Sequence, residues 1–215
     1  MFVPRCKRFA GGLAAVLLAG AGALSVFGLA QPAAAQFMGE GYKFLQAIRD
    51  RDGEAVTKAT DPSKGGTIIN TQDYSTGDTG LHIVTQRRDL DWLSFLLARG
   101  ADPNKANNAG AHPLDLAVGL GWADGAQMLL QEGARADMPG AGGETPLIVA
   151  VHRKDLPMVR LLIRFGANPN RADISGRSAR DYAALLGPDS VIASEIAAAS
   201  KAAAARKAQT YGPSF

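Results

Sequence analysis

Four short segments of similar sequence recur along this chain at a constant step of 33 residues. They begin at Thr79 (TGLHIV), His112 (HPLDLA), Thr145 (TPLIVA) and Ser178 (SARDYA). Three glycine-led turns keep the same step, namely GADPN at Gly100, GARAD at Gly133 and GANPN at Gly166. Two independent markers with one period predict a solenoid, in which each unit buries its apolar face only by stacking against its neighbours.

Each unit reads as two short helices joined by a turn. Thr145 can cap free backbone N–H groups, and Pro146 suits the first helical position. Apolar residues follow at helical spacing, at Leu147, Ala150 and Val151 in the first helix and Met158, Val159, Leu161 and Leu162 in the second. Gly166 can adopt the left-handed conformation that ends the second helix, and Pro169 prevents its continuation. Helices of about ten residues are marginal alone, so the units depend on one another.

TPLIVA at 145–150, MVRLLIRFGANPN at 158–170 and the 33-residue step resemble the ankyrin repeat family. The resemblance covers about 37–200 and is strongest over 78–173. It implies an all-α fold, an ankyrin-repeat solenoid of helix–turn–helix units with β-turn fingers and about five units including the end caps. It also implies that His82 bonds the backbone of a neighbouring turn.

We expect five segments along the chain. They are a signal peptide (1–35), an N-terminal capping repeat with a long loop (36–77), three full ankyrin repeats (78–173), a C-terminal capping repeat (174–200) and a flexible tail (201–215). The loop at 61–77 is about four residues longer than the regular turn. Glu195 takes the position that matches Leu162, as expected of a helix with one side in water. Gly119, Gly121 and Gly125 are expected to weaken the helices of the second full repeat.

The N-terminal segment has the pattern of a secretory signal. Arg5, Lys7 and Arg8 precede an uncharged run from 10 to 30, and small residues lead to a predicted cut after Ala35. Export through this cleavable segment predicts a periplasmic protein, and the alternative is an uncleaved anchor, in which case the chain would meet a membrane. Cleavage removes Cys6 and leaves 20 basic and 20 acidic residues, so net charge gives no argument for nucleic-acid binding. Charge is nevertheless uneven: 36–145 holds 15 acids and 10 bases, and 146–215 holds 5 acids and 10 bases.

The residues that bear chemistry do not form a recognisable catalytic or metal-binding set. His82, His112 and His152 occupy different positions within their repeats and would project in different directions. A zinc site needs ligands that converge to about 2 Å from one point. G-x-S-x-G and phosphate-loop spacings are absent from the sequence. We therefore expect no enzyme activity, no metal and no cofactor.

The resemblance places partner-binding residues in the concave groove and on the finger tips. By offset within the repeat, the groove positions are Gln86, Arg87, Gly119, Leu120, His152 and Arg153. The finger positions are Ser75, Thr76, Asp78, Asn108, Ala109, Ala111, Ala141, Gly142, Glu144, Ser175 and Arg177. The paired basic residues Arg87-Arg88 and Arg153-Lys154 follow the first helix at matching offsets.

The expected function is binding of a protein partner, whose identity the sequence does not give, by a monomer with capped ends. One alternative is an inhibitor or immunity-type partner of an envelope enzyme. An alternative of another class is an enzyme with an unrecognised site near the 61–77 loop.

Overall fold

The computed structural model describes residues 39–61 and 67–210, and within them the regular structure is helical. The α-helices are α1 (Glu40–Asp50), α2 (Gly53–Ala59), α3 (Gly80–Gln86), α4 (Leu90–Ala98), α5 (Pro113–Gly119), α6 (Ala123–Gln131), α7 (Pro146–His152), α8 (Leu156–Arg164), α9 (Ala179–Ala184) and α10 (Val191–Thr210). A 3₁₀ helix, η3 (Thr67–Asn70), precedes the first regular unit. The described part has no β-strand, only an isolated bridge between Ala172 and Ser178.

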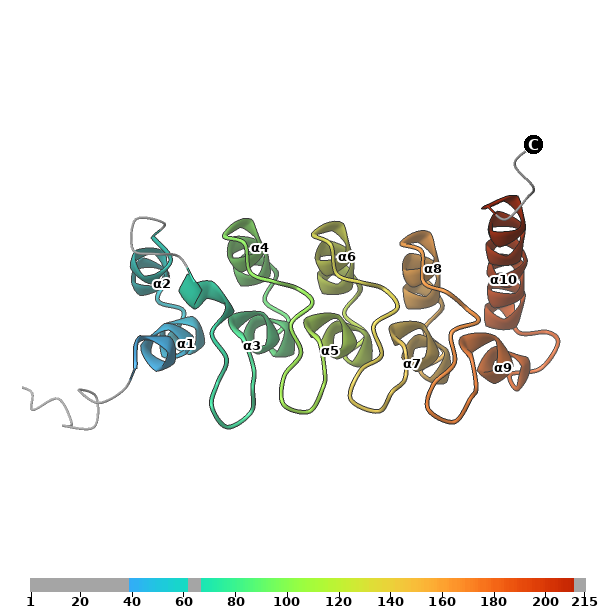
Figure 1. The fold of residues 1–215 in the computed structure, drawn as a ribbon, viewed down its shortest axis with the longest axis horizontal. Coiled ribbons are helices and arrows are strands. Elements are labelled where there is room, and N and C mark those ends of the chain that lie inside the picture. Colours follow the sequence, from blue (N-terminus) through green and yellow to red (C-terminus); the bar gives the residue numbers. More distant parts are fainter. Residues whose placement is uncertain (1–38, 62–66, 211–215) are drawn as a thin grey trace, which may run out of the picture. The chain divides into compact units, whose positions relative to one another are not determined.

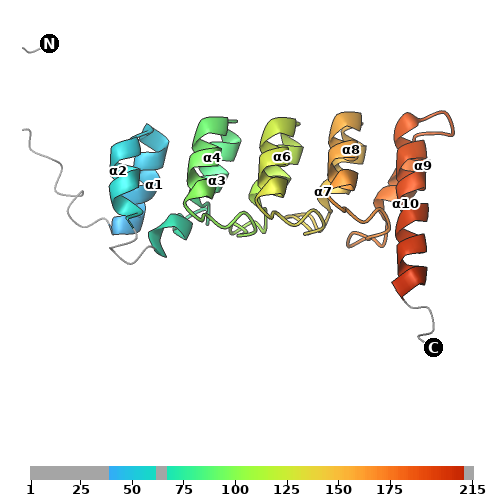
Figure 2. The ribbon, with the colours of Figure 1, turned by 90° about the horizontal axis from the view of Figure 1, so that it is seen from above.

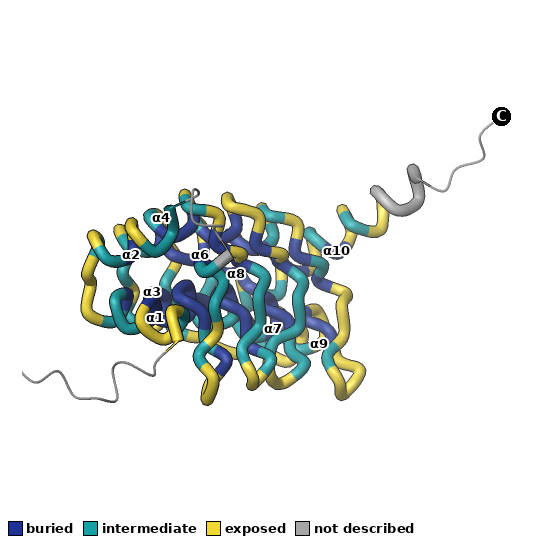
Figure 3. The backbone as a smooth tube through the Cα atoms, turned by 60° about the vertical axis from the view of Figure 1, so that its left-hand side comes forward, coloured by how far each residue is buried: buried dark blue, intermediate teal, exposed yellow. Residues whose placement is uncertain are grey.

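The helices form two rows, visible in Figures 1 and 2. The inner row contains α1, α3, α5, α7 and α9, and each packs against the next; in the outer row α4, α6, α8 and α10 do the same. Figure 3 shows the buried backbone lying between the rows and the exposed backbone at the loop tips and outer turns. Ala117, Ala150 and Ala183 are fully or almost fully buried at the same position of successive inner helices, where a small side chain lets the paired helix approach. The all-α ankyrin-repeat solenoid predicted from the sequence is therefore confirmed.

The turn between paired helices has the same geometry in the first four units. Its central residue is left-handed at Arg51, Arg88, Gly121 and Lys154, with φ of 60°, 54°, 65° and 55°. Aspartates at the N-caps of α2, α4 and α8 accept a hydrogen bond from the backbone N–H three residues on. Such a cap contributes about 1 kcal/mol to helix stability.

The unit formed by α5 and α6 departs from this pattern because Trp122 stands where the other units have aspartate. Trp122 makes no side-chain cap, and its ring lies so close to Gly125 that an added Cβ would overlap it. Gly121 occupies the left-handed turn position, where glycine is free of the strain that arginine and lysine bear. Gly121 and Gly125, expected from the sequence only to weaken this unit, thus each have a local structural reason. Gly119 has none, because it is exposed with open space around it.

Loops project from the inner row as four fingers, Asp73–Asp78, Asn107–Ala111, Gly140–Glu144 and Asp173–Arg177. In each finger the first residue donates its backbone N–H to the carbonyl of the last. The residue just before the last is a glycine with φ between 72° and 80°. Side chains with a Cβ rarely adopt this conformation, so the glycine determines the finger shape.

At the C-terminal end of the stack, charged residues stand at positions where the inner units have buried apolar residues. Arg180 is exposed at the position where Leu147 is fully buried, and Glu195 pairs with Arg160 at 2.7 Å. Helix α10 continues to Thr210, so the segment predicted as a tail from 201 is helical as far as Thr210. The alanine-rich composition of 197–205 explains this continuation, because alanine has the highest helix propensity.

The predicted signal segment, 1–35, lies outside the described residues. Among the helices that the structure describes, none combines the length and apolarity needed to cross a bilayer.

Candidate partner-binding surface

We call the exposed side of the inner helices, together with the four fingers, the inner face. Of the predicted binding residues, Ser75, Thr76, Gln86, Asn108, Ala109, Gly142, His152, Arg153 and Arg177 are exposed there, and so are Gly119, Ala141 and Ser175. Asp78, Arg87, Leu120 and Glu144 are half-buried, and Ala111 is buried. Exposure alone does not distinguish a binding residue from a structural one, so the contacts of each must decide.

The first two fingers are held together by hydrogen bonds between predicted site residues. The Asn108 backbone N–H donates to the Thr76 carbonyl at 3.0 Å, and its side-chain amide donates to the Ser75 carbonyl at 3.2 Å. The Asn107 amide donates to the Asp78 carboxylate at 2.8 Å. These bonds fix the spacing of the two fingers, so a partner would meet a surface that needs little ordering on binding.

Asp73 anchors the first finger to helix α1. Its carboxylate accepts bonds from the Ser75 hydroxyl and amide, and lies 2.6 Å from Arg49 Nη2. The Ser75 hydroxyl, together with the Arg49 guanidinium, holds the pKa of Asp73 well below its usual value.

Arg87 has a structural role that its sequence position did not reveal. Its Nη1 donates to the carbonyl oxygens of Ile48 at 2.9 Å and Arg49 at 3.0 Å, at the C-terminal end of α1. Burial lowers the pKa of the Arg87 guanidinium, while Asp89, 3.6 Å away, acts in the opposite direction. A cation at a helix C-terminus satisfies free carbonyls and complements the helix dipole. Arg87 therefore joins the first two units, and its role in partner binding stays a prediction.

His82 is fully buried at the base of the second finger. Its Nε2–H donates to the Ala111 carbonyl at 2.9 Å, and Nδ1 accepts from the Thr79 N–H at 3.1 Å, which confirms the bond to a neighbouring turn. Burial lowers the pKa of His82, so its neutral form is the one that fits.

The next unit differs from the Thr79–His82 arrangement in which residue type stands at the N-cap and which stands three residues later. His112 occupies the N-cap position and Asp115 the histidine position, with His112 Nδ1 2.8 Å from the Asp115 carboxylate. Burial raises the pKa of Asp115, and the hydrogen bonds from His112 oppose that shift. Both side chains are occupied in shaping the helix start.

The C-terminal half of the inner face brings three predicted residues together around Tyr182. His152 lies edge-on to the Tyr182 ring at 4.4 Å between centroids, and its Nδ1 is 3.4 Å from the Glu144 carboxylate. The Arg177 guanidinium lies 5.9 Å from the same ring. The Tyr182 hydroxyl donates to Asp173 at 2.8 Å.

Asp173 shapes the fourth finger on which Arg177 lies. Its carboxylate also accepts from the Ser175 hydroxyl at 2.7 Å and from the Arg177 backbone N–H at 3.0 Å. These donors, the Ser175 hydroxyl foremost, lower its pKa to about 2. The cluster combines exposed His152 and Arg177 with half-buried Glu144, Asp173 and Tyr182 on the inner face.

Sequence reasoning missed three large exposed side chains near the predicted residues. Tyr74 and Ile174 are 102% and 87% exposed on the first and last fingers, and Leu185 is 74% exposed just after α9. The sequence alone does not single them out, because isolated exposed apolar residues are normal on protein surfaces.

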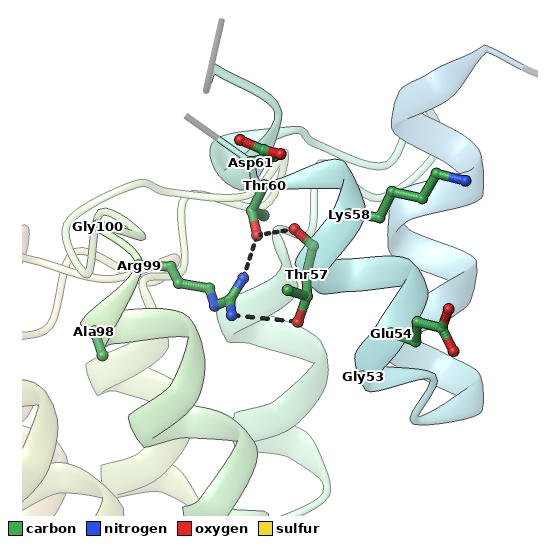
Figure 4. A pocket seen from close by; sticks show the side chains of 9 residues that line it. All are labelled: Gly53, Glu54, Thr57, Lys58, Thr60, Asp61, Ala98, Arg99 and Gly100. Atoms are coloured by element: carbon green, nitrogen blue, oxygen red, sulfur yellow. Dashed lines mark hydrogen bonds between the residues drawn. The ribbon is translucent and has the colours of Figure 1, made fainter. Parts of the chain in front are cut away.

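A hollow on the outer side of the stack lies between α2 and α4, close to the 61–77 loop (Figure 4). Arg99 crosses it, donating to the hydroxyls of Thr60 at 2.6 Å and Thr57 at 3.2 Å. Residues 62–66 of the loop fall outside the described part. In the described remainder, Asn70 accepts from the Asp102 amide and Gln72 donates to two carbonyls, so both act in loop structure. Over 39–61 and 67–210 the structure shows no cluster of three metal-ligating side chains.

Two family models match the chain: Ankyrin repeat over 76–108, and Ankyrin repeats (many copies) over 129–183. A putative ankyrin repeat-containing protein of Treponema pallidum (strain Nichols) is 41% identical over 111 residues, covering 51% of this chain and 37% of that protein. Neurogenic locus notch homolog protein 1 of Danio rerio is 35% identical over 122 residues, covering 56% of this chain and 5% of that protein. The B-cell lymphoma 3 protein homolog of Mus musculus is 35% identical over 108 residues, covering 48% of this chain and 24% of that protein.

The chain thus spans little more than a third of the Treponema protein, 37%, and 5% of the Danio rerio protein. The first match covers α3 and α4, and the second covers α7, α8 and most of α9, while α5 lies between the two matches. The chain contains ankyrin repeats, which indicate a protein–protein interaction module.

Proposed function

We propose that this protein acts in the bacterial periplasm as a non-enzymatic binding module that holds a protein partner on its inner face. The observation that carries the proposal is the cluster of Glu144, His152, Arg177 and Tyr182. These groups come from two fingers and two inner helices, and their mutual contacts hold them in place.

A surface of this kind favours protein binding because its side chains are already ordered. Fingers fixed by backbone bonds and helices fixed by stacking lose little conformational freedom when a partner arrives. Aromatic residues and arginine supply a large share of the binding energy at protein interfaces. The periplasmic part of the proposal rests on the basic, apolar and small-residue pattern of 1–35.

Affinity capture from an envelope extract of the source organism tests the binding function. The inner-face variant carries Gln86→Ala, His152→Ala and Arg177→Ala, all at exposed positions. The matched control carries Lys58→Ala, Ser94→Ala and Gln127→Ala, at exposed positions of the outer helices. The proposal predicts a protein held by the native chain and the control and lost by the inner-face variant.

Loss by the control alone would move the binding surface to the outer helices, and capture of no protein by any bait would refute the binding function. The periplasmic assignment is tested by osmotic-shock release and N-terminal sequencing. A released chain that begins at Gln36 is expected, and a chain retained in the cytosol with an intact Met1 would contradict export.

A further inference from the structure

The basic side chains of the inner face are used differently in the two halves of the stack. In the N-terminal half, Arg49 pairs with Asp73, and Arg87 donates to two carbonyls of α1. Arg88 donates to the Leu120 carbonyl of the next unit at 2.5 Å. These guanidinium groups join neighbouring elements of the chain, although Nε and Nη2 of Arg87 are buried without a hydrogen-bond partner among the described residues.

In the C-terminal half, Arg153 and Arg177 are exposed and have no such partners. Among the described residues, neither guanidinium makes an ion pair or a side-chain hydrogen bond. Arg153 Nη2 and the Asp155 carboxylate both lie beside Gly121 of the preceding unit, and the Arg177 guanidinium lies 5.9 Å from the centre of the Tyr182 ring. An exposed guanidinium with its donors unused can bind a carboxylate in two-point geometry.

The acids of the same half are already engaged. Asp173 accepts from the Tyr182 hydroxyl and the Arg177 backbone N–H, and Glu144 faces His152. The sequence adds a wider imbalance, since 146–215 holds ten basic and five acidic residues. Charge complementarity at this end therefore favours an acidic partner.

Apolar side chains lie in the same half of the face. Tyr182 packs against His152, Leu185 is 74% exposed at the end of α9, and Ile174 is 87% exposed on the fourth finger. Tyrosine and arginine are enriched among the residues that supply most of the binding energy at protein interfaces.

We infer that the C-terminal half of the inner face, formed by the third and fourth fingers with α7 and α9, binds an acidic segment of the partner that also carries aliphatic or aromatic side chains. The inference rests on the proposed function and specifies the chemistry of its partner. Carboxylates of the segment pair with Arg153 and Arg177, and its apolar side chains cover Tyr182 and Leu185.

The test is selection of short random peptides, about 12 residues long, displayed on phage and applied to the full-length protein. We expect the selected peptides to be enriched in Asp and Glu together with Leu, Phe, Tyr or Trp. The best peptide, labelled with fluorescein, is then titrated by fluorescence anisotropy. Binding should weaken several-fold between about 50 and about 500 mM salt, because exposed ion pairs are screened.

Two charge-reversal variants with equal net charge locate the site. Arg153→Glu with Arg177→Glu should weaken the peptide by roughly tenfold or more, since like charges then face each other. Lys58→Glu with Arg164→Glu, at exposed positions of outer helices α2 and α8, should change affinity less than about twofold. Far-UV circular dichroism and thermal melts check that both variants are folded.

The other outcomes each overturn the inference. Selected peptides that are basic or uncharged and still bind the inner face would contradict the acidic-segment chemistry but leave the proposed function standing. Equal weakening by both variants would show a non-specific charge effect. Failure to enrich any peptide would also refute it, while protein capture from the extract tests the binding function separately. A single-stranded oligonucleotide that binds more tightly than the acidic peptide would assign the patch to nucleic acid.

Discussion

The contact between Trp122 and Gly125 predicts that the effect of Gly125→Ala on protein stability changes sign when Trp122 is replaced. Gly125 lies in the first turn of α6, where alanine is favoured over glycine by about 0.5–1 kcal/mol. The Trp122 ring, however, occupies the space that the new methyl group needs. Overpacking of this kind costs about 1–3 kcal/mol, so Gly125→Ala should leave the protein unchanged or destabilise it by up to about 2.5 kcal/mol.

The partner substitution is Trp122→Asp, which restores the aspartate cap that Asp52, Asp89 and Asp155 provide in other units. With the ring removed, Gly125→Ala should stabilise the protein by its helix-propensity gain of about 0.5–1 kcal/mol. The change in the free energy of unfolding caused by Gly125→Ala should therefore differ by about 1 kcal/mol or more between the native chain and the Trp122→Asp variant.

The assay is urea unfolding of the native chain, both single variants and the double variant, followed by far-UV circular dichroism. Because repeat arrays can unfold in more than one step, amide exchange across α6 should accompany the unfolding curves. If Gly125→Ala stabilises both backgrounds equally, the ring does not occupy the space above Gly125 and the account of this unit is wrong.

Three further predictions follow from single contacts. Arg87→Ala should lower the free energy of unfolding by about 1–2 kcal/mol, because it removes two charge-assisted hydrogen bonds to α1. The substitution Gln86→Ala, at an exposed position, should change it by less than about 0.5 kcal/mol. Urea unfolding of both variants measures the two changes. The unfolded chain binds a proton at His82 more readily than the folded chain, so stability should fall as pH drops below the ordinary histidine pKa of 6.5. His82→Gln should flatten that fall, and unfolding curves at about pH 7.5 and about pH 5.5 measure the difference. The Asp173 carboxyl should titrate near pH 2 when followed by NMR. Tyr182→Phe should raise the pKa of Asp173, because it removes a hydrogen-bond donor that favours the carboxylate form. An unchanged pKa would mean that the Tyr182 hydroxyl does not bond Asp173 in solution.

The repeat architecture could be predicted from the sequence because it depends on features that recur. Caps such as Thr145, turn glycines such as Gly166 and the 33-residue period are local signals, and each is seen in the structure with the geometry expected. The role of His82 came from the resemblance, and the contact with Ala111 bears it out.

The candidate site was less predictable because its chemistry depends on contacts between units. Arg87 and Arg153 occupy the same offset in their repeats, yet Arg87 reaches carbonyls that the end of α1 leaves free, whereas Arg153 has no such partner among the described residues. The contact between Tyr182 and His152 joins two units, so the sequence of a single repeat does not show it. Offsets give the direction of a side chain but not whether a neighbour already uses it.

Amide hydrogen exchange of the protein with and without its captured partner tests the central claim most directly. The account predicts slower exchange on binding in the third and fourth fingers and in α7 and α9, with α4, α6 and α8 unchanged. Protection confined to the outer helices, with unchanged exchange in 140–144 and 173–177, would contradict the inner face as the binding surface.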